Sequence, residues 1–566
     1  MRRRRFIVRS WVGSAALALL LFWTDSSSAA SGSTKDAARF LDQSSFGATQ
    51  ASIARLKQLG VEAFLTEQLA GPPNNYPALA FWPSSQPSTC VNDNAASPPV
   101  TCQRDNYTYY LIQRHFFTNA LTGSDQLRQR VAFALSQILV TSESDVPLPA
   151  WMRSYQQLLY TNALGNFREL LKGVTLHPSM GRFLDMVNNR CQTRTPHNPA
   201  ICTSSSNFFA PNENYGREVL QLFSVGTLYK LNPDGTDQTD SSGNPIFTYN
   251  QQNITEFARV FTGWVLAANL PPPAGVTDPV PNYQDPMVAV ESRHDRGAKT
   301  LLNGVTIPEG KTAQEEMEIA MDNLAYHPNT APFISKQLIQ HLVSSNPSPA
   351  YVKRVAKVFS DNSHSANQLQ LVVKAILLDR EARTAPTARR RPNAGKLDEP
   401  VLFMTRFLRA LNAQSDGVIN SFSTIGSAAM AQDVFRAPSV FNYYPPDYEV
   451  PGEAGILGPA FGIFNTRTSL NRANFVNRLV FGNIPASQPD RPTGTSIDFS
   501  PWTALSTTPA NLVAELNCLL AACSLSSAAQ ATIVNAINTV PVANALRRVQ
   551  TAVYLVATTG QTSVQR

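Results

Sequence analysis

SDQLRQRVAFALSQILV, residues 124–140, decides the fold class of this chain. It opens with Ser124 and Asp125, which are residue types that cap the N-termini of helices. Apolar residues then recur at the spacing of one helix face: Leu127, Val131, Leu135 and Ile138. This period predicts an amphipathic helix that packs on a core.

The same period continues on both sides of this stretch. Upstream, Thr49 and Gly60 are typical of a helix N-cap and a helix stop. Further amphipathic runs cover residues 151–171, 314–326, 330–343, 351–359, 367–378, 400–411 and 541–556. Long Pro-rich segments separate them, at residues 74–106, 188–211, 232–250, 271–309, 384–396, 443–459 and 485–509. We therefore predict a large, mainly α, irregular helical domain with long Pro-rich loops and a few short β-hairpins.

The first thirty residues are typical of a signal peptide. Five arginines precede an apolar run from Trp11 to Trp23, and small residues favour cleavage after Ala30. The run is too short for a stable membrane span. Because RRRFIV approaches a twin-arginine signal, the twin-arginine and general secretory routes both stay open. The predicted domains are a signal peptide at 1–30, a main helical domain at 31–480 and a helical extension packed on it at 481–566.

The charge does not favour a nucleic-acid partner. Without the five arginines and one aspartate of the leader, the net charge falls from +7 to +3. The one compact basic stretch, residues 388–396, is more typical of a solvated connector than of a phosphate-binding surface.

The cysteines indicate disulfides. They form three close pairs along the chain: Cys90 with Cys102, Cys191 with Cys202, and Cys518 with Cys523. An even number in an exported chain favours bridges. The spacing does not match a zinc site. We expect a periplasmic or extracellular protein with no membrane span after cleavage.

PNENYGREVLQLFSVG, residues 211–226, concentrates polar groups at the start of a helix. Asn212 suits an N-cap, and Glu213 and Arg217 are four residues apart, as in a helical ion pair. Asn214 and Glu218 have the same spacing. We predict a clamp of Asn212, Asn214 and Arg217 with Glu213.

Glu218 adjoins the apolar face and has no basic partner further along its helix, so it needs a distant one. Candidate partners are His177 and the segment that contains His294, Asp295 and Lys299. A histidine with carboxylates could form an acid/base pair or hold a divalent metal of unassigned identity. His177 precedes Pro178, a pattern that favours a structural helix cap.

Several stretches resemble one known family: ARFLDQSSFGAT, LRQRVAFALSQILV, TLHPSMGRFLDM, NENYGREVLQLFSVG, EFARVFTGW, HDRGAKTLLNG, HPNTAPFISKQLIQHLV and APSVFNYYPPDY. They are similar to bacterial proteins catalogued as domain of unknown function 1800. The resemblance implies an exported, mainly helical protein. It points to the following positions: His177, Asn212, Glu213, Asn214, Arg217, Glu218, His294 and Asp295. It also implies a partner, an exported sulfatase- or phosphatase-like protein catalogued as domain of unknown function 1501. Gln221 and Phe223 depart from the family pattern, which weakens a metal site.

Three functions follow as hypotheses. The first is a hydrolase-like enzyme with catalytic Glu218, Glu213, His177, His294 and Asp295. The second is a scaffold that binds the sulfatase- or phosphatase-like partner. The third is a carbohydrate- or surface-binding module that uses the aromatic segment FNYYPPDYEVPG, residues 441–452, with Tyr443, Tyr444 and Tyr448 exposed.

Overall fold

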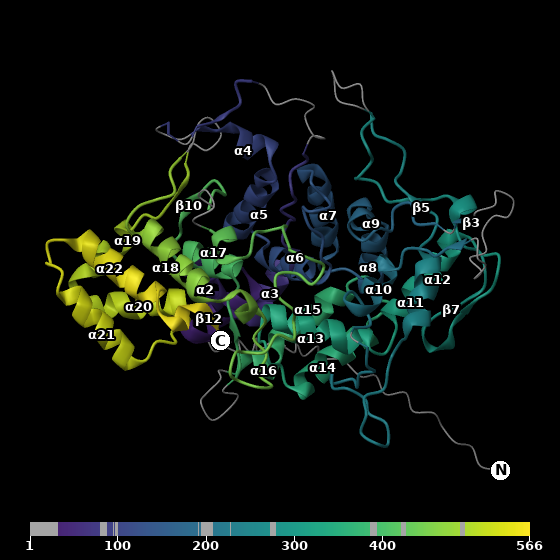
Figure 1. Ribbon diagram of the computed structural model, residues 1–566. Coiled ribbons are helices and arrows are strands. Elements are labelled where there is room, and N and C mark those ends of the chain that lie inside the picture. Colours follow the sequence, from purple (N-terminus) through teal and green to yellow (C-terminus); the bar gives the residue numbers. More distant parts are fainter. Residues whose placement is uncertain are drawn as a thin grey trace, which may run out of the picture.

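The computed structural model describes residues 32–79, 88–93, 95–96, 100–190, 192–193, 208–226, 228–271, 279–384, 393–419, 426–486 and 493–566. Helices dominate these residues, and the strands form only short antiparallel pairs (Figure 1). The predicted mainly α class is confirmed. The predicted signal peptide lies outside the described residues.

The helices are irregular in length and direction (Figure 1). The first part of the chain contains α1 (Thr34–Ser44), α2 (Gln50–Leu59), α3 (Val61–Ala70), α4 (Cys102–Tyr107), α5 (Tyr110–Thr122), α6 (Gln126–Ile138), α7 (Pro149–Asn162), α8 (Phe167–Leu176), α9 (Pro178–Phe183), α10 (Asn214–Gln221) and α11 (Gln251–Val260). The second part contains α12 (Ala313–Ala325), α13 (Thr330–Leu342), α14 (Pro349–Asp361), α15 (Gln368–Leu378), α16 (Arg380–Arg383), α17 (Pro400–Ala410), α18 (Thr466–Val480), α19 (Ser500–Thr503), α20 (Pro509–Ala521), α21 (Ser527–Asn538) and α22 (Ala545–Ala557).

The strands of the described residues pair two by two, always antiparallel. The pairs are β1 (Asn92–Asp93) with β2 (Val100–Thr101), β3 (Gln192–Thr193) with β4 (Phe208–Phe209), β5 (Trp264–Val265) with β6 (Val288–Ala289), β7 (Lys299–Thr300) with β8 (Thr306–Ile307), β9 (Lys396–Leu397) with β12 (Val564–Gln565), and β10 (Gln414–Ser415) with β11 (Thr495–Ser496). The β9–β12 pair joins the C-terminus to the middle of the chain. These ladders are too short to form a sheet core.

Helix α6, which corresponds to the segment at residues 124–140, is central. It packs against α1, α3, α5, α7 and α13. Its apolar face is buried as expected, and so are its polar residues Gln126, Gln129, Arg130 and Gln137. Asp125 is the N-cap residue but makes no cap hydrogen bond; its carboxylate accepts instead from Tyr160 and from the Asn74 backbone.

Other helix boundaries agree with the predicted caps. Thr49 and Ser52 form a capping box at α2, and Gly60 ends that helix with φ 79°. The predicted run at residues 151–171 is not one helix. It divides into α7 and α8, because the Asn166 side chain accepts from the Arg168 and Glu169 backbone N–H groups and starts a new helix.

One hydrophobic core extends through most of the described chain, from Ala37 to Ala557. Helices α19 to α22 gather at the left of Figure 1, where α20 packs on α1 and α17. Residues after 480 thus contribute side chains to the same core, and the domain boundary at 480 stays a prediction.

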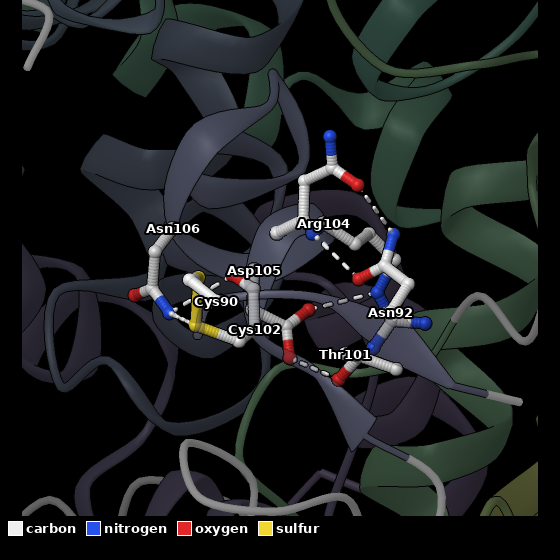
Figure 2. Close-up of a disulfide and its surroundings, with 8 residues drawn as sticks. Cys90, Asn92, Thr101, Cys102, Arg104, Asp105 and Asn106 are labelled. Carbon is white, nitrogen blue, oxygen red and sulfur yellow. Dashed lines mark hydrogen bonds and ion pairs between the residues drawn. A yellow bond between two sulfur atoms is a disulfide. The ribbon is translucent and has the colours of Figure 1, made fainter. Parts of the chain in front are cut away.

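Two of the predicted disulfides are present, Cys90–Cys102 and Cys518–Cys523. Figure 2 shows the first, beside the start of α4. Around it, the buried Asp105 carboxylate accepts from Thr101 Oγ1 at 2.6 Å and from Arg104 Nε at 2.8 Å. The bridge and these bonds fix the β1–β2 hairpin on α4. The predicted Cys191–Cys202 bridge lies outside the described residues.

Helices long and apolar enough to cross a bilayer do not occur in the described part of the chain.

Candidate functional site

Glu213, just before α10, connects two helices. Its carboxylate accepts hydrogen bonds from Arg217 Nη2 at 3.2 Å, Thr255 Oγ1 at 2.7 Å and Gln251 Nε2 at 2.7 Å. Gln251 and Thr255 belong to α11. The predicted Glu213–Arg217 ion pair is therefore present, and it fastens α10 to α11.

The two asparagines of the predicted clamp have different roles. Asn212 Oδ1 accepts from the Asn214 backbone N–H at 2.8 Å, which tightens the turn into α10. The Asn212 backbone also exchanges two hydrogen bonds with the Asn189 side chain. Asn214 Nδ2 donates to Asp185 at 3.3 Å and makes no hydrogen bond to Glu218.

Glu218 is buried, and the described residues supply no hydrogen bond to one of its carboxylate oxygens. Its residue is 6% exposed, and its Oε2 atom has no hydrogen bond. The guanidinium of Arg217 contacts Glu213 and Gln251 instead. Burial raises the pKa of Glu218, and the charge of Arg217 opposes this rise. The distant neutralising group that the sequence required is not found in the described residues.

His177 caps a helix, as its His-Pro pattern indicates. Its Nδ1 accepts from the Ser179 backbone N–H at 3.1 Å, and its Nε2 lies 3.1 Å from Ser154 Oγ. Burial lowers the pKa of His177 to about 3, so the ring is neutral. Because Nδ1 is an acceptor, the single ring proton is on Nε2, and this N–H donates to Ser154. His177 in this tautomer cannot take a proton from Ser154.

His294 and Asp295 belong to a closed network of buried charges. Asp295 forms a two-point ion pair with Arg259, at 2.7 and 3.2 Å. His294 Nδ1 donates to the Thr262 carbonyl at 2.9 Å, and its Nε2 lies 3.3 Å from Glu316. Lys299 Nζ lies 2.8 Å from the Glu316 carboxylate. His294, Asp295 and Glu316 are completely buried, so this network has the character of a structural element.

The structure therefore places the predicted catalytic residues in separate environments. No hydrogen bond or ion pair of the described residues joins Glu218 to His177 or to His294. The described residues also include no group of three or more His, Cys, Asp or Glu side chains arranged to hold a metal ion.

A cavity of about 200 Å³ opens elsewhere, between α6, α10, α13, β9 and the segment that follows Val440. Its wall is largely apolar, with Phe333, Phe441 and several prolines. Its polar groups come from distant parts of the chain: Gln137, Gln221, Gln337, Gln340, His341, Ser345, Lys396, Asn442, Tyr444 and Asp447. A concave apolar wall with a few converging polar groups is typical of a ligand site.

Two buried cations meet at the His341 carbonyl: Lys396, which lines the cavity, and Arg130, which is not part of the lining. Lys396 Nζ and Arg130 Nη2 each donate to the backbone carbonyl of His341, both at 2.6 Å. Arg130 is 0% exposed. Burial lowers the pKa of Lys396 to about 8 and that of the His341 ring to about 3. The His341 ring is thus neutral at pH 7, whereas Lys396 is largely charged.

A carboxylate lies behind them. Glu399 Oε1 is 4.0 Å from Lys396 Nζ, and Glu399 Oε2 accepts from Tyr444 at 2.9 Å and Gln432 at 2.6 Å. Burial acts to raise the pKa of Glu399, but Lys396 and Arg130 hold it below its ordinary value. Glu399 is therefore ionised.

Two glutamine amides on the lining are unsatisfied. Gln137 Oε1 accepts from Asn442 at 3.2 Å, which leaves the Nε2 group of Gln137 without a partner. Gln337 Nε2 also has no partner. Both residues are more than nine-tenths buried. Unsatisfied buried donors are rare in folded proteins and call for a specific explanation.

Two segments of this site were already noted in the sequence, one for its aromatic residues and one for its basic residues. The aromatic segment at residues 441–452 lines the cavity. Of the tyrosines expected to be exposed there, Tyr444 is 8% exposed with its hydroxyl bound to Glu399, whereas Tyr443 and Tyr448 are half-buried. The basic stretch at residues 388–396 was expected to be solvated. Its last residue, Lys396, is buried because β9 pairs with β12.

Arg130, Gln137 and Gln337 were missed as functional residues. Each of the three residues lies in a helix that the apolar residues around it already predict. Nothing in the neighbouring sequence therefore distinguishes them from ordinary polar residues of a helix.

Comparison with known proteins gives one match. The family model described as "Protein of unknown function (DUF1800)" matches residues 39–561. Neither the curated proteins nor the solved structures contain a match. The chain therefore belongs to the DUF1800 family.

Proposed function

We propose that this protein is an exported binding protein whose cavity takes one small polar unit, such as a single sugar ring. The observation that carries the proposal is the pair of unsatisfied amides, Gln137 and Gln337, in an otherwise apolar wall. A ligand with hydroxyl or carboxylate oxygens would satisfy them, because both are hydrogen-bond donors. Of the three functions suggested by the sequence, binding by the aromatic segment is the one that this geometry favours.

The size of the cavity limits the ligand. Pockets for drug-sized molecules have volumes of roughly 300–1,000 Å³. The present cavity, at about 200 Å³, suits one ring or a terminal residue of a longer polymer. Phe441, 51% exposed, is in a position to contact a longer ligand at the rim.

Export is part of the proposal. The two disulfides, Cys90–Cys102 and Cys518–Cys523, are typical of a protein in an oxidising compartment. The signal-like leader supports the same location. A cavity of this kind in an exported protein suits a nutrient or a component of an extracellular polymer.

The hydrolase hypothesis has less support. It needs Glu218 to act with a histidine, and the histidines have other partners: His177 is a helix cap and His294 faces Glu316. Glu213 is engaged by three donors. The scaffold hypothesis needs an arginine bound to Glu218, and Arg217 is bound to Glu213.

Thermal denaturation with a panel of monosaccharides, uronic acids and amino acids tests the proposal. A ligand of the cavity raises the melting temperature of the parent protein, because it binds only the folded state. Gln337→Leu keeps the volume but removes a donor, so we expect a smaller shift. Gln58→Leu, at an exposed position on α2, is the control and should behave as the parent. Equal shifts in all three proteins would contradict binding in this cavity.

A further inference from the structure

We infer that the ligand carries one negative charge, as a carboxylate or a sulfate ester, which lies beside Lys396, the lining cation that shares the His341 carbonyl with Arg130. This inference rests on the proposed binding function and assigns the chemical class of the ligand. It follows from a charge imbalance among the described residues around the cavity.

Arg130 forms no ion pair within 4 Å in the described part of the chain, and the charges of Glu399 and Asp398 stabilise it only from a greater distance. Its Nη2 group donates to the His341 carbonyl, and its Nε and Nη1 groups have no hydrogen-bond partner. No carboxylate of the described residues lies within ion-pair distance of Arg130. An isolated buried charge is strongly unfavourable. The site is therefore electrostatically prepared for an anion.

Lys396 adds a second cation at the same carbonyl oxygen. A backbone carbonyl is only a dipole, so it cannot neutralise two full charges. Glu399, 4.0 Å from Lys396, provides one negative charge. Two cations against one carboxylate leave an excess of one positive charge, because the His341 ring is neutral.

Neighbouring carboxylates do not correct this excess. Asp398 pairs with Arg406 at 2.6 Å, and Asp42 lies 3.5 Å from the same guanidinium. Burial raises the pKa of Asp42 to about 7, which reduces its negative charge. Arg472 is a further cation in this layer; it donates to the Asp398 carbonyl and lies over the rings of Phe403 and Phe464. Counted over the whole layer, the positive excess is one with Asp42 ionised and two with Asp42 protonated; the four cations are Arg130, Lys396, Arg406 and Arg472, and the carboxylates are Glu399, Asp398 and Asp42.

The acidic residue on the described lining is Asp447, which is exposed at the rim. Water screens a charge there, so it counts little against the buried excess. The unsatisfied amides of Gln137 and Gln337 are donors, as an oxyanion requires. Glu399 Oε1 has no hydrogen-bond partner in the described part of the chain, and Lys396 Nζ lies 4.0 Å from it.

With Asp42 ionised, the balance favours a ligand that carries a single negative charge. A carboxylate or a sulfate ester brings one negative charge, whereas phosphate brings up to two at pH 7. A charge-assisted hydrogen bond to Lys396 is stronger than a neutral one by an amount equivalent to about tenfold in affinity. A neutral sugar of the same shape should therefore bind more weakly.

Isothermal titration calorimetry at constant ionic strength tests this, with D-glucuronate, D-glucose, methyl sulfate and inorganic phosphate as probes. We expect D-glucuronate or methyl sulfate to bind the parent about tenfold more tightly than D-glucose. Lys396→Met should remove this preference. Lys357→Met, at an exposed site on α14, should retain it. If Lys396→Met does not fold, the ratio of the parent's affinities for the charged probes and for D-glucose still tests whether the ligand carries a charge.

Each outcome separates the inference from the proposed function. Equal affinity for D-glucose and D-glucuronate overturns the charge but leaves the binding function intact. Tighter binding of phosphate than of both singly charged probes overturns the single charge. No binding of any of the four probes overturns the inference, and the binding function is then judged by the wider panel and Gln337→Leu.

Discussion

Replacing Glu218 by Met should stabilise the protein at neutral pH. The Glu218 side chain is buried, its Oε2 atom has no hydrogen-bond partner, and burial raises its pKa. Methionine has a similar length, favours helices and needs no partner. The variant therefore removes an unfavourable buried charge from α10 without leaving a large cavity.

The magnitude follows from two opposing effects. A buried polar group without a partner destabilises by about 1–3 kcal/mol. The attraction between Arg217 and the Glu218 carboxylate offsets less than about 1 kcal/mol of this destabilisation, because the Arg217 side chain is 41% exposed and is bound to Glu213. We expect Glu218→Met to raise the free energy of unfolding by about 1–2 kcal/mol at pH 7.

The pH dependence provides a second test. The folded-state pKa of Glu218 is raised, so the folded protein holds this proton more tightly than the unfolded chain does. Stability from this group is therefore lost as pH rises from the unfolded pKa through the folded one. The advantage of Glu218→Met should be greatest above the folded-state pKa, shrink as the pH falls from that pKa toward the ordinary one, and vanish below about pH 4.5, where the carboxyl is protonated in both states.

Urea denaturation followed by circular dichroism at pH 7 and pH 4 measures both effects. Glu213→Met is the matched control on the same helix; it loses three hydrogen bonds and should destabilise by about 1–3 kcal/mol. If Glu218→Met were as destabilising as Glu213→Met, Glu218 would have a strong partner and our interpretation of its environment would be refuted.

Other substitutions test the remaining assignments. His177→Asn should change stability by less than about 1 kcal/mol, since Asn also caps helices, whereas His177→Ala should destabilise by about 1 kcal/mol; a large loss for both would contradict a capping role. Glu316→Gln should destabilise by about 3 kcal/mol, because it leaves the buried Lys299 with only Asp295, at 3.9 Å, as a carboxylate neighbour among the described residues. An unchanged urea midpoint would contradict a structural role of this network. Opening the Cys90–Cys102 bridge by a double Ser substitution should destabilise by about 2–3 kcal/mol, measured by the same titration, and no change would show that the loop is held by Asp105 alone.

The fold class was predictable because its signals are local. The helical period at residues 124–140 and the caps at Thr49 and Gly60 depend only on neighbours along the chain. The Glu213–Arg217 pair was predictable for the same reason, since its spacing places both side chains on one helix face. Asn166 was overlooked because a continuous apolar period concealed its cap at the start of α8.

The cavity was not predictable because its parts are distant in sequence. Gln137, Gln337, Lys396 and Tyr444 come together only when α6, α13, β9 and the aromatic segment pack. Burial of Lys396 depends on the pairing of β9 with the C-terminal strand β12. No local pattern contains that pairing, so a basic residue after three arginines was interpreted as solvated.

The burial of α6 explains why polar residues there point to function. Arg130 and Gln137 are seven residues apart, so they lie on the same side of α6, two turns from each other. Other helices cover α6 on several sides. Apolar side chains could fill this space without the free-energy cost of removing a polar group from water. A buried ion or amide is often less stable than a packed hydrophobic residue of similar volume. This central helix nevertheless carries a guanidinium without an ion pair to the described residues and, on the lining of the cavity, an unsatisfied amide. A ligand explains this combination better than stability alone.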